Sequence, residues 1–322
     1  MADIQTLINN FNGKSIDLKY SLKIGGAKAV ANALLTNTCI TSLDLSDNHM
    51  CDEDVIVIVD TLQSNTSLTN LNLSRNNIYD GGALAIANAL LKNTTLTSLK
   101  LSINNIGIAG AKALSNALLK NTSVTNLELD YNDIEDDGVK AIAATLLKNN
   151  SLTSLCLNHN RIRAEGAEAI ANALLKNTGL TSLGLDWNNM GADGGKAIAA
   201  ALLKNTTLTN LDLRWNHIGD EGGKAMANML LKNTTLINLD LRCNYIDLEG
   251  TKAIAAALIK NTTITRVNID YSSASQQLLR KLVERNKRYV KYKPNMQIFL
   301  DTSNVLDGLQ DIINNYLLLM CF

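Results

Sequence analysis

Several features of secreted, membrane-spanning and nucleic-acid-binding proteins are missing from this sequence. The 322 residues include one proline, and aromatic residues make up 4% of the chain. Lysine plus arginine and aspartate plus glutamate number 30 each, so no overall charge points to nucleic acid or to a cationic partner. No apolar run reaches the length of a membrane helix, and the first residues lack the apolar stretch of a secretory signal.

The cysteines show no disulfide pattern. They are five in number, an odd count, and they lack paired spacing: Cys39, Cys51, Cys156, Cys243 and Cys321. Stable disulfides belong to oxidising compartments, so these isolated thiols indicate a reducing one. We therefore expect a cytoplasmic site of action, which includes the cytosol of a host cell.

One segment recurs nine times at a constant spacing of 28 residues. Its second leucine-type anchor falls at Leu43, Leu71, Leu99, Leu127, Leu155, Leu183, Leu211, Leu239 and Val267. Each unit has the pattern L-x-x-L-x-L-x-x-N-x-I/M, then a turn with glycine, then an alanine-rich helical stretch that mostly ends in Leu-Leu-Lys-Asn. Repetition at such a period predicts one elongated solenoid of stacked layers rather than two separate domains.

The repeat contains a strand and a helix. In each L-x-L core, residues two apart point to the same side, so Leu71 and Leu73 face inward and Asn72 faces outward. The alanine-rich stretch carries its apolar residues on one helical stripe. Neighbouring strands lie about 4.8 Å apart, whereas packed helices need about 8–10 Å. The strands must therefore line the inside of an arc, with the helices outside.

Two asparagine columns accompany the repeat. The asparagine of each L-x-x-N element is expected to point inward and bond the backbone of neighbouring turns. A second asparagine follows most helices as part of an Asn-x-Ser/Thr sequon, at Asn65, Asn93, Asn121, Asn149, Asn205, Asn233 and Asn261. Glycans on successive layers would collide, which favours the cytosol. We expect this second asparagine to end the helix in a left-handed conformation.

This pattern resembles the leucine-rich repeat family, and its length resembles the ribonuclease-inhibitor-like class of 28-residue repeats. The resemblance runs from Ile16 to Tyr271. It implies an α/β solenoid, or horseshoe, with parallel strands on the concave face, helices on the convex face and a helical C-terminal cap. It also implies a protein partner on the concave face, without identifying that partner.

The ends of the chain depart from the repeat. We assign 1–15 to an N-terminal cap segment, 16–274 to the solenoid and 275–322 to a C-terminal helical cap with an amphipathic tail. The cap segment is expected to fold over the apolar helix positions Ile56 and Leu84; the alternative is that these positions form an apolar surface for a partner or for self-association. Residues 276–322 combine a basic helix with an apolar tail, so contact with an anionic membrane stays open beside the simpler interpretation of a solvated cap.

Candidate binding residues lie where the layers differ. One column after the strands contains Tyr131, His159, Trp187, Trp215 and Tyr271, and so holds both tryptophans of the chain. The columns on either side add the remaining candidates, Asp186, Arg214, Arg242, His217 and Tyr245. Tryptophan, tyrosine and arginine dominate binding energy at many interfaces, so we predict a partner centred on Trp187 and Trp215. The alternative is that the rings stack on one another and shield the sheet.

No catalytic, cofactor or metal site is predicted. Gly194-Gly195-Lys196 lacks the spacing of a phosphate-binding loop, and the three histidines lack a nucleophilic partner at a recognised spacing. Nucleic acid is not expected as a partner, and the oligomeric state is left open. The leading hypothesis is a noncatalytic interaction module. The alternative is a regulator of another enzyme, either resembling activators of small GTPases through Arg161, Arg214 or Arg242, or resembling ubiquitin-ligase adaptors. Either protein could be a bacterial effector in a host cytosol.

Overall fold

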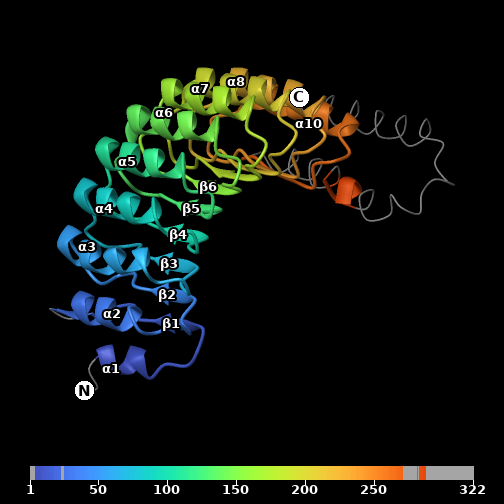
Figure 1. Ribbon diagram of the computed structural model, residues 1–322. Coiled ribbons are helices and arrows are strands. Elements are labelled where there is room, and N and C mark those ends of the chain that lie inside the picture. The colour runs from blue at the N-terminus through green and yellow to red at the C-terminus, as the bar shows by residue number, and fades with distance from the viewer. Residues whose placement is uncertain (1–3, 23–24, 271–280, 282, 288–322) are drawn as a thin grey trace.

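The protein forms an arc of stacked strand and helix layers (Figure 1). The computed structural model describes residues 4–22, 25–270, 281 and 283–287. Its strands are β1 (Ser15–Asp17), β2 (Ser42–Asp44), β3 (Asn70–Asn72), β4 (Ser98–Lys100), β5 (Asn126–Glu128), β6 (Ser154–Cys156), β7 (Ser182–Gly184), β8 (Asn210–Asp212), β9 (Asn238–Asp240) and β10 (Arg266–Asn268). These strands form one parallel sheet in sequence order, as predicted from the repeat.

Helices cover the outer side of the arc (Figure 1). They are α1 (Ile4–Asn9), α2 (Gly26–Leu34), α3 (Asp52–Asp60), α4 (Asp80–Leu90), α5 (Ile108–Leu118), α6 (Glu135–Leu146), α7 (Ala164–Leu174), α8 (Gly191–Leu202), α9 (Gly219–Leu230) and α10 (Leu248–Lys260). A short 3-10 turn, η1 (Thr61–Gln63), follows α3. None of the described helices has the length and apolar composition needed to cross a bilayer.

The strand register follows the sequence period. Leu183 pairs with Leu155 on one side and with Leu211 on the other, so equivalent residues align across the sheet. The inward leucines and the apolar helix stripes form one continuous buried cluster along the arc. This confirms the predicted solenoid with strands inside and helices outside.

The inner asparagine column bonds the layers together, as expected. Asn188 donates from Nδ2 to the carbonyls of Leu157 (3.1 Å) and Leu185 (2.9 Å). Its Oδ1 accepts from the backbone N–H groups of Asn160 (3.0 Å) and Ile162 (3.0 Å). One carboxamide therefore satisfies buried backbone groups of two layers, where no regular ladder can reach them.

The prediction for the second asparagine column is wrong. None of the seven sequon asparagines has a positive φ. Asn205 is instead buried, donates to the Leu174 carbonyl of the preceding layer (2.9 Å) and accepts from the N–H groups of Thr207 (3.1 Å) and Leu208 (2.9 Å). The side chain itself closes the turn from helix to strand, so the backbone does not need a left-handed residue there.

The expectation that the N-terminal segment covers Ile56 and Leu84 is also wrong for the described residues of that segment. α1 packs against α2 at the end of the arc, and its Ile8 is fully buried. Ile56 and Leu84 stay 39% and 52% exposed. The open end of the core exposes a larger apolar surface than two helix side chains do, so a short helix stabilises the fold more by closing that end.

The other end of the solenoid is closed by part of a helix. Residues 283–287 are helical. Arg285 donates to the carbonyls of Leu258 (2.8 Å) and Ile259 (2.9 Å), and Asn286 donates to those of Asn261 (2.8 Å) and Ile264 (2.9 Å). Tyr271 and the tail from 288 onward, with the membrane contact suggested for it, lie outside the described residues.

Candidate functional site

Four ring side chains from successive layers form a row at the carboxyl edge of the sheet, with the first two stacked on each other and the last two likewise. Tyr131, His159, Trp187 and Trp215 each follow the last residue of a strand, β5 to β8, by three positions. Their ring centroids are separated by 4.4 Å, 5.9 Å and 4.7 Å in that order. We call these four residues the aromatic ladder. The sheet thus brings together four of the predicted site residues.

The backbone fixes the direction of each ring. All four residues have a φ of 52° to 54°, in the left-handed region that large side chains rarely occupy. Their N–H groups donate to carbonyls of the next layer, as in the bond from Trp187 to Arg214 (2.9 Å) and from His159 to Asp186 (2.7 Å). These bonds between layers hold the unusual conformation, which points the rings away from the core.

The ladder is stacked and exposed at the same time. Tyr131, Trp187 and Trp215 are 47%, 49% and 43% exposed, because the rings contact one another through their faces and leave their edges in water. In the next column, His217 and Tyr245 approach to 5.2 Å. Self-stacking therefore occurs, but it leaves enough aromatic surface free for a partner. Binding to that surface stays a prediction.

A polar column supports the ladder from beside it. Asp130 accepts from the N–H of Asn158 (2.9 Å), and the carboxamide of Asn158 accepts in turn from the N–H of Asp186 (2.7 Å). Arg214 pairs with Asp186 (2.9 Å) and with Asp212 (2.8 Å). These bonds join successive layers immediately before the ladder residues, so they add to its rigidity.

Burial perturbs the carboxyl groups of this column. Desolvation raises the pKa of Asp130 to about 6, and the nearby charge of Glu128 adds to that rise, while the N–H of Asn158 opposes it. Burial also raises the pKa of Asp186, and the charge of Asp212 acts in the same direction. Each ionised carboxylate here destabilises the fold relative to its neutral form.

Asp130→Asn should therefore stabilise the protein at high pH. The pKa of Asp130 is higher in the folded protein than in the unfolded chain, so between about pH 4 and 6 the folded protein binds more protons than the unfolded chain. The free energy of unfolding therefore falls as the pH rises through that range. Allowing for the water that still reaches the carboxyl, we expect a gain of about 1 to 2 kcal/mol near pH 8 and little difference near pH 4.

Urea unfolding of both proteins at the two pH values would measure this gain. The control is Asp193→Asn at an exposed helix position, which should change stability little at either pH. An equal effect of Asp130→Asn at both pH values would show that desolvation of the charge is not the cause.

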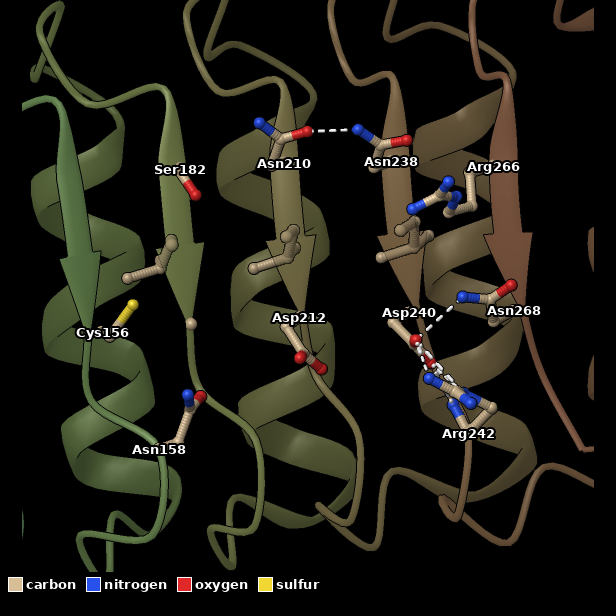
Figure 2. Close-up of a pocket in the computed structure, with 14 residues that line it drawn as sticks. Cys156, Asn158, Ser182, Asn210, Asp212, Asn238, Asp240, Arg242, Arg266 and Asn268 are labelled. Carbon is tan, nitrogen blue, oxygen red and sulfur yellow. Dashed lines mark hydrogen bonds and ion pairs between the residues drawn. The ribbon is translucent and has the colours of Figure 1, made fainter. Parts of the chain in front are cut away.

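A groove of about 420 Å³ lies on the concave face beside the ladder (Figure 2). Gly184 has no side chain to fill it, and Asp212, Asp240 and Arg242 reach it from the ends of neighbouring strands. Asn210 and Asn238 line it at the amino ends of β8 and β9. The strand residues were not among the predicted site residues, although the outward position between the two inward leucines varies from layer to layer and could have identified them.

The three candidate arginines are all paired with carboxylates. Arg161 contacts Asp133 (2.9 Å), Arg214 has its two partners in the polar column, and Arg242 contacts Asp240 (2.6 Å). An arginine that acts in the active site of another enzyme would first have to leave these pairs. The regulator alternative thus gains no support from the arginine geometry.

Comparison with known proteins agrees with this architecture. A family model described as Leucine Rich repeat matches residues 36–59, 64–87, 92–115, 120–143, 148–171, 176–199, 204–227 and 232–255. No curated protein matches the sequence. The Rad7 and Elc1 complex in yeast is a solved structure that resembles this chain at 15% identity, with a TM-score of 0.56, and covers 88% of this chain and 69% of its own.

A second solved structure is LegL7, a leucine-rich repeat-containing protein from Legionella pneumophila. It is 19% identical to this chain, with a TM-score of 0.48. The match covers 88% of this chain and 95% of the LegL7 chain. The family model matches more than half of the chain, and the layers follow one another without insertion through the whole matched region. The protein is therefore a member of the leucine-rich repeat family.

Proposed function

We propose that this protein is a noncatalytic interaction module that binds a partner protein through the aromatic ladder and the groove beside it. The half-exposed ladder is the observation that supports this most. Aromatic residues make up only 4% of the chain, yet both tryptophans and a tyrosine are exposed in one row, with a half-buried histidine between them. The buried cluster is built without them, so core packing does not explain their placement.

The two parts of this surface suit different parts of a partner. The ring edges offer apolar contact, with the tryptophan and tyrosine side chains that most often anchor interfaces. The groove offers carboxylates, carboxamides and Arg242 to polar groups. Because bonds between layers already hold the ladder residues in place, binding would cost little further ordering of this surface.

Affinity capture from a cytosolic extract, followed by titration of the captured partner, would test the proposal. We expect Trp187→Ala with Trp215→Ala to weaken binding about thirtyfold, since an anchor of this kind contributes roughly 2 kcal/mol and the stacked pair acts as one unit. The matched control is Tyr20→Ala with Tyr79→Ala, two rings that are 72% and 55% exposed away from the ladder. Full retention of all partners by the tryptophan variant would refute the proposal.

We further propose that the protein acts in a cytosol, including that of a host cell. The sequon asparagines support this, because the side chains of Asn93, Asn121 and their equivalents are buried and donate from Nδ2 to the preceding layer. A glycan attached to that nitrogen would remove the bond and force the turn open. Expression through a secretory pathway should therefore yield either unglycosylated or misfolded protein, as mass measurement and circular dichroism would show.

A further inference from the structure

The edge of the arc opposite the ladder carries a row of exposed leucines. Each one directly follows the last residue of a helix, and the six successive layers from α4 to α9 are alike. Their side chains are 42% to 47% exposed, at Leu91, Leu119, Leu147, Leu175, Leu203 and Leu231. Ordinary protein surfaces expose single, scattered leucines. A row of exposed leucines that continues over six layers is unusual, and such extended apolar surfaces commonly mark interaction sites.

A lysine follows each of these leucines. The six lysines are exposed, at Lys92, Lys120, Lys148, Lys176, Lys204 and Lys232. We call the two rows together the Leu–Lys rim. Lys92 donates to the side chain of Gln63 (2.7 Å), and none of the six takes part in an ion pair between described residues. By contrast, the helix lysines Lys140, Lys196 and Lys224 each pair with a carboxylate three residues earlier.

The six layers that form the rim have no carboxylate on the rim edge. Residues 91–99 and the five equivalent segments up to 231–239 contain no aspartate or glutamate. The carboxylates of these layers fall between the last residue of a strand and the middle of the following helix, on the ladder side. Helices α4 to α9 all end at the rim. Their dipoles account for a cation at each helix end, but they do not account for an exposed leucine beside it.

We propose that the Leu–Lys rim docks on an anionic phospholipid surface. Lysines close to such a surface are attracted to the lipid phosphates, and leucines can enter the boundary between headgroups and acyl chains. The rim is nearly identical in six layers, which suits a chemically uniform surface better than a protein partner with a particular sequence. A nucleic-acid backbone is also uniform and anionic, but it offers the leucines no apolar contact.

Co-sedimentation of the full chain with vesicles tests this. We expect binding to phosphatidylcholine vesicles that contain phosphatidylserine, weakening with salt, and none to phosphatidylcholine alone. Changing Lys120, Lys148, Lys176 and Lys204 to glutamine should lower the partition coefficient about a thousandfold. The control changes four helix lysines, Lys140, Lys196, Lys224 and Lys252, to glutamine. It removes the same charge and should leave binding nearly unchanged.

A leucine variant separates lipid from other anions. Changing Leu119, Leu147, Leu175 and Leu203 to glutamine should lower vesicle binding about tenfold or more, because partly buried apolar area is lost. Unchanged vesicle binding by this variant, together with tight binding of the wild type to single-stranded DNA, would overturn the proposal in favour of a polyanion site. Failure of the wild type to sediment, or equal binding by the rim and control lysine variants, would also overturn it. Thermal unfolding would confirm that each variant is folded.

Discussion

Replacing Asn188 with alanine is expected to lower the free energy of unfolding by about 4 kcal/mol. Its carboxamide bonds two buried N–H groups of one layer through Oδ1 and carbonyls of two layers through Nδ2. Alanine supplies no donor or acceptor, and the sealed interior gives water little access. Each buried group that loses its partner costs about 1 to 3 kcal/mol, so the total exceeds the effect of a single lost hydrogen bond.

The neighbouring Asn189 provides a matched control. It is exposed, and Asn189→Ala should change stability by less than about 0.5 kcal/mol. Urea unfolding followed by circular dichroism would compare both variants with the wild type. Similar small losses for the two substitutions would mean that the inner column does not stabilise the layers as we describe.

The second large effect is expected at the C-terminal end of the solenoid. Arg285→Ala with Asn286→Ala should reduce the protection of α10 amides from hydrogen exchange by two orders of magnitude or more, equivalent to about 3 kcal/mol. The two side chains donate to carbonyls at the end of α10 and in the turn before β10, which have no further layer to bond them. Without these donors, the last layer should open more often than its neighbours.

A control for this experiment comes from the same helix. Glu284 and Lys287 form an exposed ion pair (3.3 Å), and their replacement by alanine should leave exchange in α10 nearly unchanged. If both double variants raise exchange equally, the contacts of Arg285 and Asn286 are not what stabilises the end.

Most of the fold could be predicted because it depends on a period. A constant step of 28 residues, an L-x-L core and different packing distances for strands and helices leave one arrangement for the layers. The inner asparagine column was predictable for the same reason, since a polar residue at an inward position needs backbone partners. The second column was misjudged because asparagine can close a turn either by its own backbone conformation or by its side chain. The sequence does not distinguish the two.

The site was harder to predict than the fold. The column of Trp187 and Trp215 followed from the register, but the left-handed backbone and the stacking depend on bonds to the next layer. The hollow at Gly184 arises from a missing side chain among larger neighbours, and it becomes visible only when the strands are placed side by side. The Leu–Lys rim could not be predicted, because its leucines recur in every layer like the buried leucines of the core. Only the structure shows that they are exposed.

The bonds between layers have a consequence for how such a chain can change length. Those of Asn188 span 26, 28 and 31 residues, so each links one unit only to the unit beside it. Duplication or loss of a complete unit in the genome would leave every donor with an acceptor in the neighbouring unit. The solenoid can therefore lengthen or shorten by whole units during evolution. Each added unit extends the curved inner surface and both edges by the same amount.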